Sequence, residues 1–277
     1  MTRNVEDMMM PAWMQDAAPG TTIAGGETHP PRDTVRLNGP PGTGKTTEIS
    51  KRGAYLIEEE DVAPSEITLV TYRRSLADAV ESRLREWGVL GEDIDSDTDL
   101  EFWTTIHAAA NRATGLLADA SRDRNADSGL GPAVAEREKA AFCRGVLNVE
   151  YFADEPWEDS RGKLLMGLFG YLRNNLLDPL DSVDVRKAPQ YDQLVEEWPG
   201  VDVAEQWETY LDWKAQRELY DFYELLEHAV DGALPPIEVV VVDEYHDATP
   251  LMAKLSERWV DAAETAIVAG DPKQVVN

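Results

Sequence analysis

The feature that most constrains this chain is a glycine-rich segment that lies between a strand pattern and a helical pattern. Residues 39–46 fit the pattern G-x-x-x-x-G-K-[ST] at every fixed position. Residues 34–38 before it predict a short strand, and residues 45–59 predict a helix. Such a turn points backbone N–H groups inward at the positive end of a helix dipole, which suits phosphate groups. Because a loop of this kind follows a sheet strand, the segment predicts an α/β fold.

The side chains at the end of the segment predict ATP and Mg²⁺ as its ligands. Lys45 is expected to reach the β- and γ-phosphates, and the Thr46 hydroxyl is expected to ligate Mg²⁺. A turn that bound nothing would not require this Lys-Thr pair. The residues expected to contact the nucleotide are Gly39, Pro40, Pro41, Gly42, Thr43, Gly44, Lys45, Thr46 and Thr47.

A second pattern with related chemistry lies far along the chain. Residues 237–242 form an almost continuous β-branched run, of the kind found in the middle of a parallel sheet, and Asp243 and Glu244 follow it. Ligands of open α/β sheets bind at the carboxyl ends of the strands. Asp243 is therefore predicted to hold Mg²⁺, and Glu244 to orient and deprotonate an attacking water. Taken alone, such an ending is often ordinary strand-to-loop polarity, but the phosphate loop favours the functional interpretation.

Strand and helix patterns alternate on both sides of a long helical stretch. Further strands are predicted at residues 67–72, 100–105 and 266–269, and further helices at 75–87 and 249–263. This alternation predicts a parallel sheet flanked by helices.

The composition divides the chain into four ranges. Residues 1–33 combine prolines and glycines without a sustained period and are expected to form a mobile tail. Residues 34–110 and 231–277 carry the strand patterns and are expected to form one domain. Residues 111–230 are rich in Ala, Leu, Glu and Arg and predict an all-helical insertion subdomain. Its helical periods cover residues 133–146, 163–177 and 203–228.

The formal net charge of −27 is unusual for a chain that would bind nucleic acid. Two interpretations remain open: an acidic mesophilic protein, or a surface adapted to a salt-rich, halophilic cytoplasm, where charges are screened beyond roughly 3 Å at 1 M salt. The excess of arginine over lysine favours the second interpretation.

Salt adaptation predicts that the chain gains stability as KCl approaches molar concentration, because screening weakens repulsion between its acidic side chains. Thermal unfolding at increasing KCl measures this effect. A chain that is fully folded and equally stable in low salt would contradict the halophilic interpretation.

Neither cysteine usage nor hydropathy indicates an exported or membrane-bound chain. The single cysteine, Cys143, excludes an intrachain disulfide and is expected to be a buried thiol. Residues 1–16 contain acids and methionines where a signal peptide requires a basic stretch and an apolar run. Since no segment approaches the roughly 20 apolar residues of a membrane span, we expect a cytoplasmic protein without membrane contacts.

Four further segments accompany the phosphate loop: residues 71–77, 104–107, 243–250 and 270–274. Together they resemble motifs of the superfamily 1A DNA helicases of the UvrD/Rep type. Residues 243–250 resemble motif II, D-E-x-x-D, and residues 270–274 resemble motif III, G-D-x-x-Q. Residues 71–77 resemble motif Ia and residues 104–107 resemble motif Ib. With the phosphate loop they stand in the family's order from about residue 34 to the end of the chain. The resemblance implies a RecA-like P-loop NTPase sheet, the first motor domain (1A), and ATP-driven travel on single-stranded DNA, in the 3′-to-5′ direction, for replication, repair or recombination.

The resemblance also implies roles for individual residues. Gln274 would sense the γ-phosphate and act in catalysis beside Lys45, Asp243 and Glu244. Contacts to DNA would come from Tyr72, which would stack on a base, from Arg73, and from Thr105 and His107 along the strand path. Each has a structural alternative: Tyr72 as a strand-end core aromatic, His107 as a satisfied structural histidine, and Arg73 as a solvated side chain.

The spacing of the motifs also matches this family. Lys45 and Asp243 are separated by the predicted helical insertion, where the UvrD/Rep group has its subdomain 1B. Compact AAA+ ATPases share the loop sequence but usually have the second acidic motif much sooner.

The chain departs from the family's motifs at several positions, and these departures limit the activity that the resemblance implies. Residues 21–36 contain no adenine-reading glutamine, and Thr47 replaces a frequent arginine. Motifs IV to VI have no counterpart, so a second RecA-like motor domain, in cis or in trans, is expected to complete the enzyme. Because that domain carries the arginines that stabilise the transferring phosphoryl group, we expect slow hydrolysis by this chain alone. The alternative is a stand-alone ATP-switched binding or regulatory module without motor activity.

Overall fold

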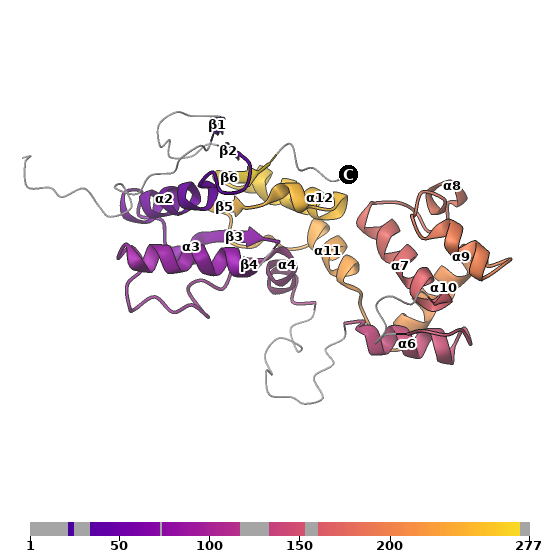
Figure 1. Cartoon of the computed structure of the whole chain (residues 1–277). Helices are drawn as coiled ribbons and strands as arrows, with labels where there is room; N and C mark the ends of the chain where they lie inside the picture. The colour runs from indigo at the N-terminus through magenta and orange to yellow at the C-terminus, as the bar shows by residue number, and fades with distance from the viewer. Residues whose placement is uncertain (1–21, 25–33, 73, 117–132, 153–159, 272–277) are drawn as a thin grey trace, which may run out of the picture. The chain divides into compact units, whose positions relative to one another are not determined.

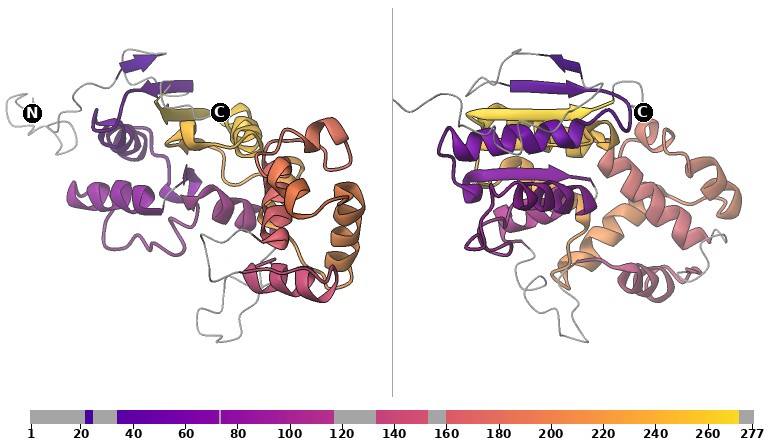
Figure 2. Two further views of the ribbon diagram at one scale, coloured as in Figure 1. Left: turned by 45° about the vertical axis from the view of Figure 1, so that its right-hand side comes forward. Right: turned by 60° about the vertical axis from the view of Figure 1, so that its left-hand side comes forward.

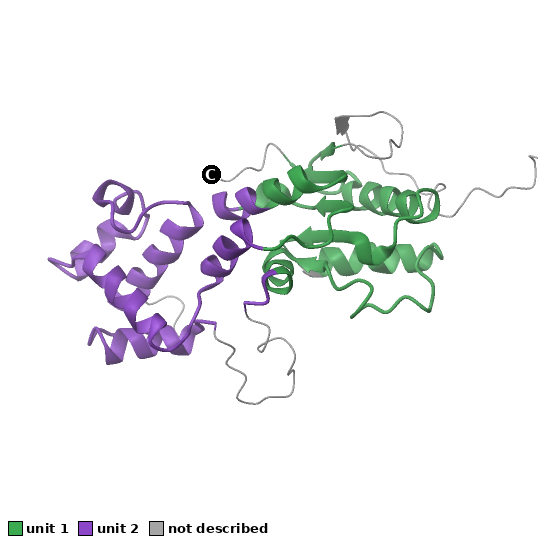
Figure 3. Cartoon of the chain, turned by 180° about the vertical axis from the view of Figure 1, so that it is seen from behind, with its two compact units in different colours: residues 1–113, 233–248, 256–277 green, residues 114–232, 249–255 purple. Residues whose placement is uncertain are grey.

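The computed structural model describes residues 22–24, 34–72, 74–116, 133–152 and 160–271. The chain divides into two compact units, coloured separately in Figure 3. Unit 1 comprises Met1–Ala113, Ala233–Ala248 and Ser256–Asn277, and unit 2 comprises Thr114–Gly232 and Thr249–Leu255.

Unit 1 is built on a six-stranded sheet with the strand order β1-β2-β6-β5-β3-β4. All neighbouring pairs among β2, β6, β5, β3 and β4 are parallel, and β1 pairs antiparallel with β2 at the edge. Figure 2 shows β2 and the yellow β6 side by side, although they come from opposite ends of the chain. The strands are β1 (Thr22–Ala24), β2 (Thr34–Asn38), β3 (Ile67–Thr71), β4 (Trp103–Thr105), β5 (Val239–Val242) and β6 (Thr265–Gly270).

Hydrophobic sequence explains which strands lie in the middle of this sheet. Every residue of β3 and of β5 is buried, as expected for strands covered on both faces. In β2 burial alternates along the strand, with Val35 and Leu37 buried. The parallel α/β fold predicted from the sequence is therefore confirmed.

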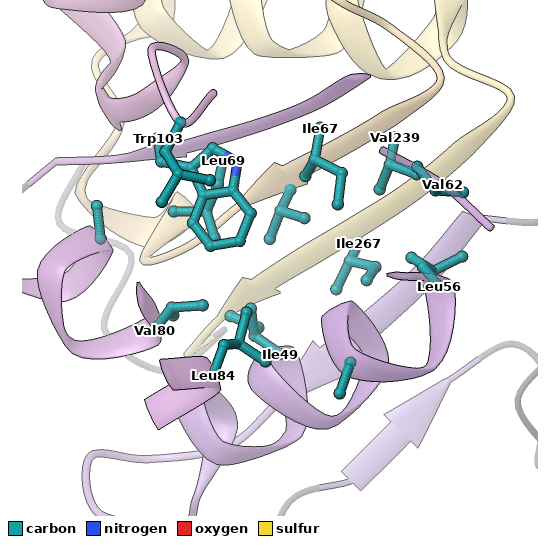
Figure 4. Close-up of a cluster of buried hydrophobic side chains, with 14 of the residues drawn as sticks. Ile49, Leu56, Val62, Ile67, Leu69, Val80, Leu84, Trp103, Val239 and Ile267 are labelled. Carbon is teal, nitrogen blue, oxygen red and sulfur yellow. The ribbon is translucent and has the colours of Figure 1, made fainter. Parts of the chain in front are cut away.

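Helices α2 (Lys45–Glu58) and α3 (Arg74–Glu86) cover one face of the sheet (Figure 1). Their buried side chains pack on the strand residues that point to the same side, and the indole of Trp103 closes the end of this layer (Figure 4). The labelled members of this core are Ile49, Leu56, Val62, Ile67, Leu69, Val80, Leu84, Trp103, Val239 and Ile267.

Shorter elements connect the strands of unit 1. Residues Pro64–Glu66 form the 3₁₀ turn η2 before β3, and Ile106–Thr114 form α4 directly after β4. Residues Tyr245–Asp247 form the 3₁₀ turn η3 after β5, and Pro250–Ala262 form α12, whose first residues belong to unit 2.

Among the described residues of unit 2, helices joined by loops are the only extended secondary structure, beside one isolated bridge between Ala133 and Tyr220. Its helices are α6 (Glu136–Gly145), α7 (Arg161–Asn174), α8 (Ser182–Val185), α9 (Tyr191–Glu197), α10 (Val203–Ala215) and α11 (Phe222–Asp231). The sequence pattern at 203–228 suggested one continuous helical period, but the structure divides it. Glu218 adopts a left-handed conformation with φ of 54°, and Asp221 starts the next helix with a capping box to Glu224.

The core of unit 2 combines packed aromatic rings with one buried lysine. Phe142 packs against Tyr210, with ring centroids 4.9 Å apart. Lys214 is 2 % exposed and lies 2.6 Å from carboxylate oxygens of both Asp221 and Glu224. The Tyr210 and Tyr223 hydroxyls donate to Asp221 at 2.8 and 2.6 Å, so the buried charges are enclosed by hydrogen bonds. The predicted buried thiol, Cys143, is fully buried beside this core, and burial raises its pKa to about 12.

Two local features differ from the sequence-based expectations. Within the range 1–33, predicted as a mobile tail, Thr22–Ala24 form β1 and pair with the outer side of β2; the rest of that range lies outside the described residues. Strand β4 is shorter than predicted, because residues 100–102 form a turn in which Trp103 N–H donates to Leu100 O. Among the described helices none is long and apolar enough to cross a bilayer.

Candidate nucleotide-binding site

The predicted chemical residues follow the carboxyl ends of neighbouring strands in unit 1. The glycine-rich loop follows β2, Asp271 follows β6, and Asp243 follows β5, and these three strands are adjacent in the sheet. The Gly39 N–H donates to the Gly270 carbonyl at 3.2 Å, which fixes the start of the loop against the end of β6. Residues 39 and 243, distant in sequence, are thus brought to one edge of the sheet.

Glycine is required at specific positions of the loop for geometric reasons. Gly42 and Gly44 have φ of 79° and 87°, a region that other residues rarely adopt. At Gly39 an added Cβ would lie 2.4 Å from Thr43 Oγ1. The loop closes on itself, because the Thr43 N–H and hydroxyl both donate to the Pro40 carbonyl.

The side chain of Lys45 is buried inside the glycine-rich loop. Lys45 begins α2 and is 6 % exposed, and its Nζ donates to the carbonyl of Gly39 at 2.8 Å. Thr46 follows on the first turn of the same helix. The Thr47 hydroxyl accepts a hydrogen bond of 2.7 Å from Arg83 Nη1, so in this structure Thr47 contacts α3.

The Asp243 carboxylate is buried and incompletely hydrogen-bonded. Its backbone N–H extends the ladder to Val70 O at 3.0 Å, and its Oδ1 accepts from the Glu244 N–H at 2.8 Å. Its Oδ2 is buried without a hydrogen-bond partner among the described residues. Burial, followed by the charge of Glu244, raises the pKa of Asp243 to about 6, partly offset by the Glu244 N–H, Lys45 and His246. An anion held in this way is suited to an added cation.

Glu244 is held in an uncommon backbone conformation at the turn after β5. Its φ of 54° and ψ of 38° lie in the left-handed region, which is unusual for a residue with a side chain. The turn is closed by the Asp247 N–H, which donates to the Glu244 carbonyl at 2.8 Å. One Glu244 carboxylate oxygen lies 3.2 Å from Nδ1 of His246. Strain of this kind is typical of functional turns.

The P-loop NTPase class is defined by three features of a parallel sheet. A glycine-rich loop follows one strand, a lysine is enclosed by that loop, and an acidic pair follows a nearby strand. Within that class, the model of the UvrD/REP helicase N-terminal domain matches residues 26–276. The chain therefore belongs to the UvrD/REP helicase N-terminal domain family.

Two curated relatives illustrate this membership. The chain is 26% identical over 267 residues to the ATP-dependent DNA helicase UvrD2 of Mycobacterium tuberculosis, which covers 89% of this chain and 35% of the relative. It is 22% identical over 248 residues to the ATP-dependent DNA helicase PcrA of Staphylococcus aureus, covering 85% of this chain and 30% of the relative. The chain thus spans about a third of the length of these relatives.

Three of the residues predicted to contact DNA, Tyr72, Thr105 and His107, lie at the same carboxyl edge and are partly buried in unit 1. Tyr72 follows β3 and is half-buried; burial raises the pKa of its hydroxyl, an effect that Ser256 on α12 partly offsets. Thr105 ends β4, and its Oγ1 accepts from the Ala108 N–H at 3.4 Å, as a helix cap does. Burial lowers the pKa of His107, which favours the neutral form of its imidazole.

Two predicted site residues, Arg73 and Gln274, lie outside the described residues. In the other direction, sequence reasoning assigned no role to Arg83 or His246. Arg83 had no signal, because its contact with Thr47 depends on how α2 and α3 pack. His246 was visible within the motif II segment, but its partners only become clear in the fold.

Proposed function

We propose that unit 1 binds ATP with Mg²⁺ at the carboxyl edge of its sheet. The observation that carries this proposal is the buried Oδ2 of Asp243, which has no hydrogen-bond partner within the described ranges and lies at the same sheet edge as the glycine-rich loop. Mg²⁺ is usually bound by one or two carboxylates together with the phosphates, and the Asp243 carboxylate would supply one such ligand.

The roles of this chain's residues follow from their positions. The N–H groups of residues 42–46 and the ammonium of Lys45 would bind the β- and γ-phosphates, and Thr46 and Asp243 would hold the metal. Bound Mg²⁺ supplies neutralisation of the phosphate charge. Glu244 would take a proton from the attacking water, since its carboxylate lies one residue beyond the metal-binding aspartate.

We further propose that the chain is the ATP-binding half of a DNA helicase or translocase. Its family membership supports this function and does not favour the alternative of a stand-alone switch module. In this proposal unit 2 is the helical 1B subdomain, and Tyr72, Arg73, Thr105 and His107 line the path of single-stranded DNA. Gln274 would sense the γ-phosphate, and a second RecA-like motor domain would complete the enzyme.

The substitution Glu244→Gln tests the assignment of the general base. We expect Mg-ATP to stabilise this variant as it stabilises the wild-type chain, whereas hydrolysis slows by roughly 10²–10⁴-fold, because the amide cannot accept the proton of water. Single-turnover hydrolysis measured with excess chain resolves the slow rate. An unchanged rate in E244Q would remove Glu244 from this role.

Strand displacement tests the motor itself. The chain together with its second motor domain, joined in cis or supplied in trans, is expected to unwind a duplex with a 3′ single-stranded tail in an ATP-dependent reaction, and K45A in that assembly is expected to abolish it. Unwinding from a 5′ tail alone would contradict the proposed direction. ATP binding without any unwinding or translocation would favour the switch module.

A further inference from the structure

An arginine on the helix that follows β3 contacts the first turn of the helix that follows the glycine-rich loop. Arg83 lies on α3, and its Nη1 donates to the Thr47 hydroxyl at 2.7 Å. Thr47 directly follows the proposed metal ligand Thr46 in the first turn of α2. The function proposed above gives Arg83 no role, although its guanidinium lies beside the proposed phosphate site.

The packing of α3 against α2 fixes where this guanidinium lies. A Cβ added to Gly53 on α2 would lie 3.8 Å from Cδ1 of Leu84, so the two helices are in close contact. Leu84, the residue after Arg83, is fully buried. The guanidinium carbon of Arg83 lies 6.0 Å from the centre of the Trp87 ring. The side chain is therefore held by Trp87 from its own helix and by Thr47 from α2.

Arg83 differs from the neighbouring arginines because it has no carboxylate partner. The chain has 53 acidic and 26 basic residues, so an acid is available to most arginines. Arg52 on α2 lies 3.0 Å from Glu48, and Arg85 on α3 lies 2.9 Å from Glu81. Within the parts of the chain that the structure describes, no carboxylate lies at ion-pair distance from Arg83. Its charge is therefore not neutralised by an ion pair there.

The turn beside this charge is suited to an anion. The first N–H groups of a helix lack acceptors within the helix and carry the positive end of its dipole. The acid of this turn, Glu48, is already paired with Arg52. A guanidinium has five N–H donors, and the hydrogen bond to Thr47 uses one of them. The remaining donors and the charge are suited to phosphate oxygens.

We propose that Arg83 is a further nucleotide-binding residue, which supplies a second cation, beside that of Lys45, for the phosphates of bound ATP. The inference rests on the proposed function of this site. The positive charge attracts the phosphates, and the Thr47 hydroxyl orients the guanidinium at the first turn of α2. The two cations come from different helices, because α3 packs beside α2.

Substitutions that separate charge from packing test this role. Arg83→Gln removes the charge but keeps a donor for Thr47, and Arg83→Met removes the charge but keeps the apolar contact with Trp87. Both residues are good helix formers. We expect each neutral variant to raise the Kd of Mg-ATP roughly tenfold, and Arg83→Lys, which keeps the charge, to raise it by less than about threefold. Isothermal titration calorimetry with Mg-ATP measures these affinities, and circular dichroism verifies that each variant is folded.

The salt dependence of binding provides a readout that a purely structural role would not change. We expect the ratio of the Kd of R83Q to that of the wild-type chain to fall as KCl rises, because salt screens the attraction between the guanidinium and the phosphates. Arg186→Gln is the matched control: it removes the same charge from an exposed side chain of unit 2. Its Mg-ATP affinity is expected to equal that of the wild-type chain.

Three results would overturn the inference. The first is a wild-type affinity in the folded neutral variants. The second is an equal loss in R83K and R83Q, and the third is a Kd ratio that KCl does not change, since both would assign the effect to packing. A wild-type chain that does not bind Mg-ATP would instead overturn the proposed function.

Discussion

Replacing Lys45 by Ala is expected to abolish the stabilisation of the chain by Mg-ATP. A ligand that binds only the folded state stabilises it by about 2.7 kcal/mol at a concentration 100 times its Kd. Lys45 provides the cation of the glycine-rich loop, and in the structure its ammonium donates to the loop carbonyls of Gly39 and Pro40. Without this charge the β- and γ-phosphates would face only backbone N–H groups.

Thermal unfolding with and without Mg-ATP measures this effect, and Lys51→Ala provides the control. Lys51 lies on the same helix, α2, beyond the loop, so its loss is expected to leave the nucleotide-induced shift unchanged. A K45A chain that Mg-ATP stabilises as strongly as the wild-type chain would contradict the assignment of the phosphate-binding loop.

Replacing Lys214 by Met is expected to destabilise unit 2 by about 3–5 kcal/mol, because it leaves the carboxylate of Asp221 buried without its cation. Methionine has a similar length and no charge, so the effect of volume is small. Lys214 is 2 % exposed, Asp221 is 5 % exposed, and their charged atoms are 2.6 Å apart. Urea unfolding followed by tryptophan fluorescence measures the change, since Trp207 and Trp213 lie in this core.

The matched control is Lys187→Met, also in unit 2. Lys187 pairs with Asp184 at 2.6 Å, but its side chain is 53 % exposed, and exposed ion pairs contribute little to stability. We therefore expect the urea midpoint of K187M to remain close to that of the wild-type chain. Equal midpoints in K214M and K187M would show that the buried pair does not stabilise unit 2.

The sequence predicted the elements of unit 1 well, because their signals are local. The glycine-rich loop, the β-branched run before Asp243 and the helix after Lys45 each depend on the chemistry of neighbouring residues. The predictions were weaker in the helical region. Residues 203–228 have a continuous helical composition, but Glu218 and the capping residue Asp221 divide them into α10 and α11.

The sequence by itself determined the class of fold, the family and the residues expected to handle phosphate and metal, since these are encoded in short motifs whose order is visible in the chain. Only the tertiary structure decided how these motifs meet. The strand order places β6 between β2 and β5, so that Gly270 receives the Gly39 N–H while Asp271 and Glu244 share Nδ1 of His246. The physical reason is that strand pairing joins residues across long sequence separations, which local propensity cannot specify.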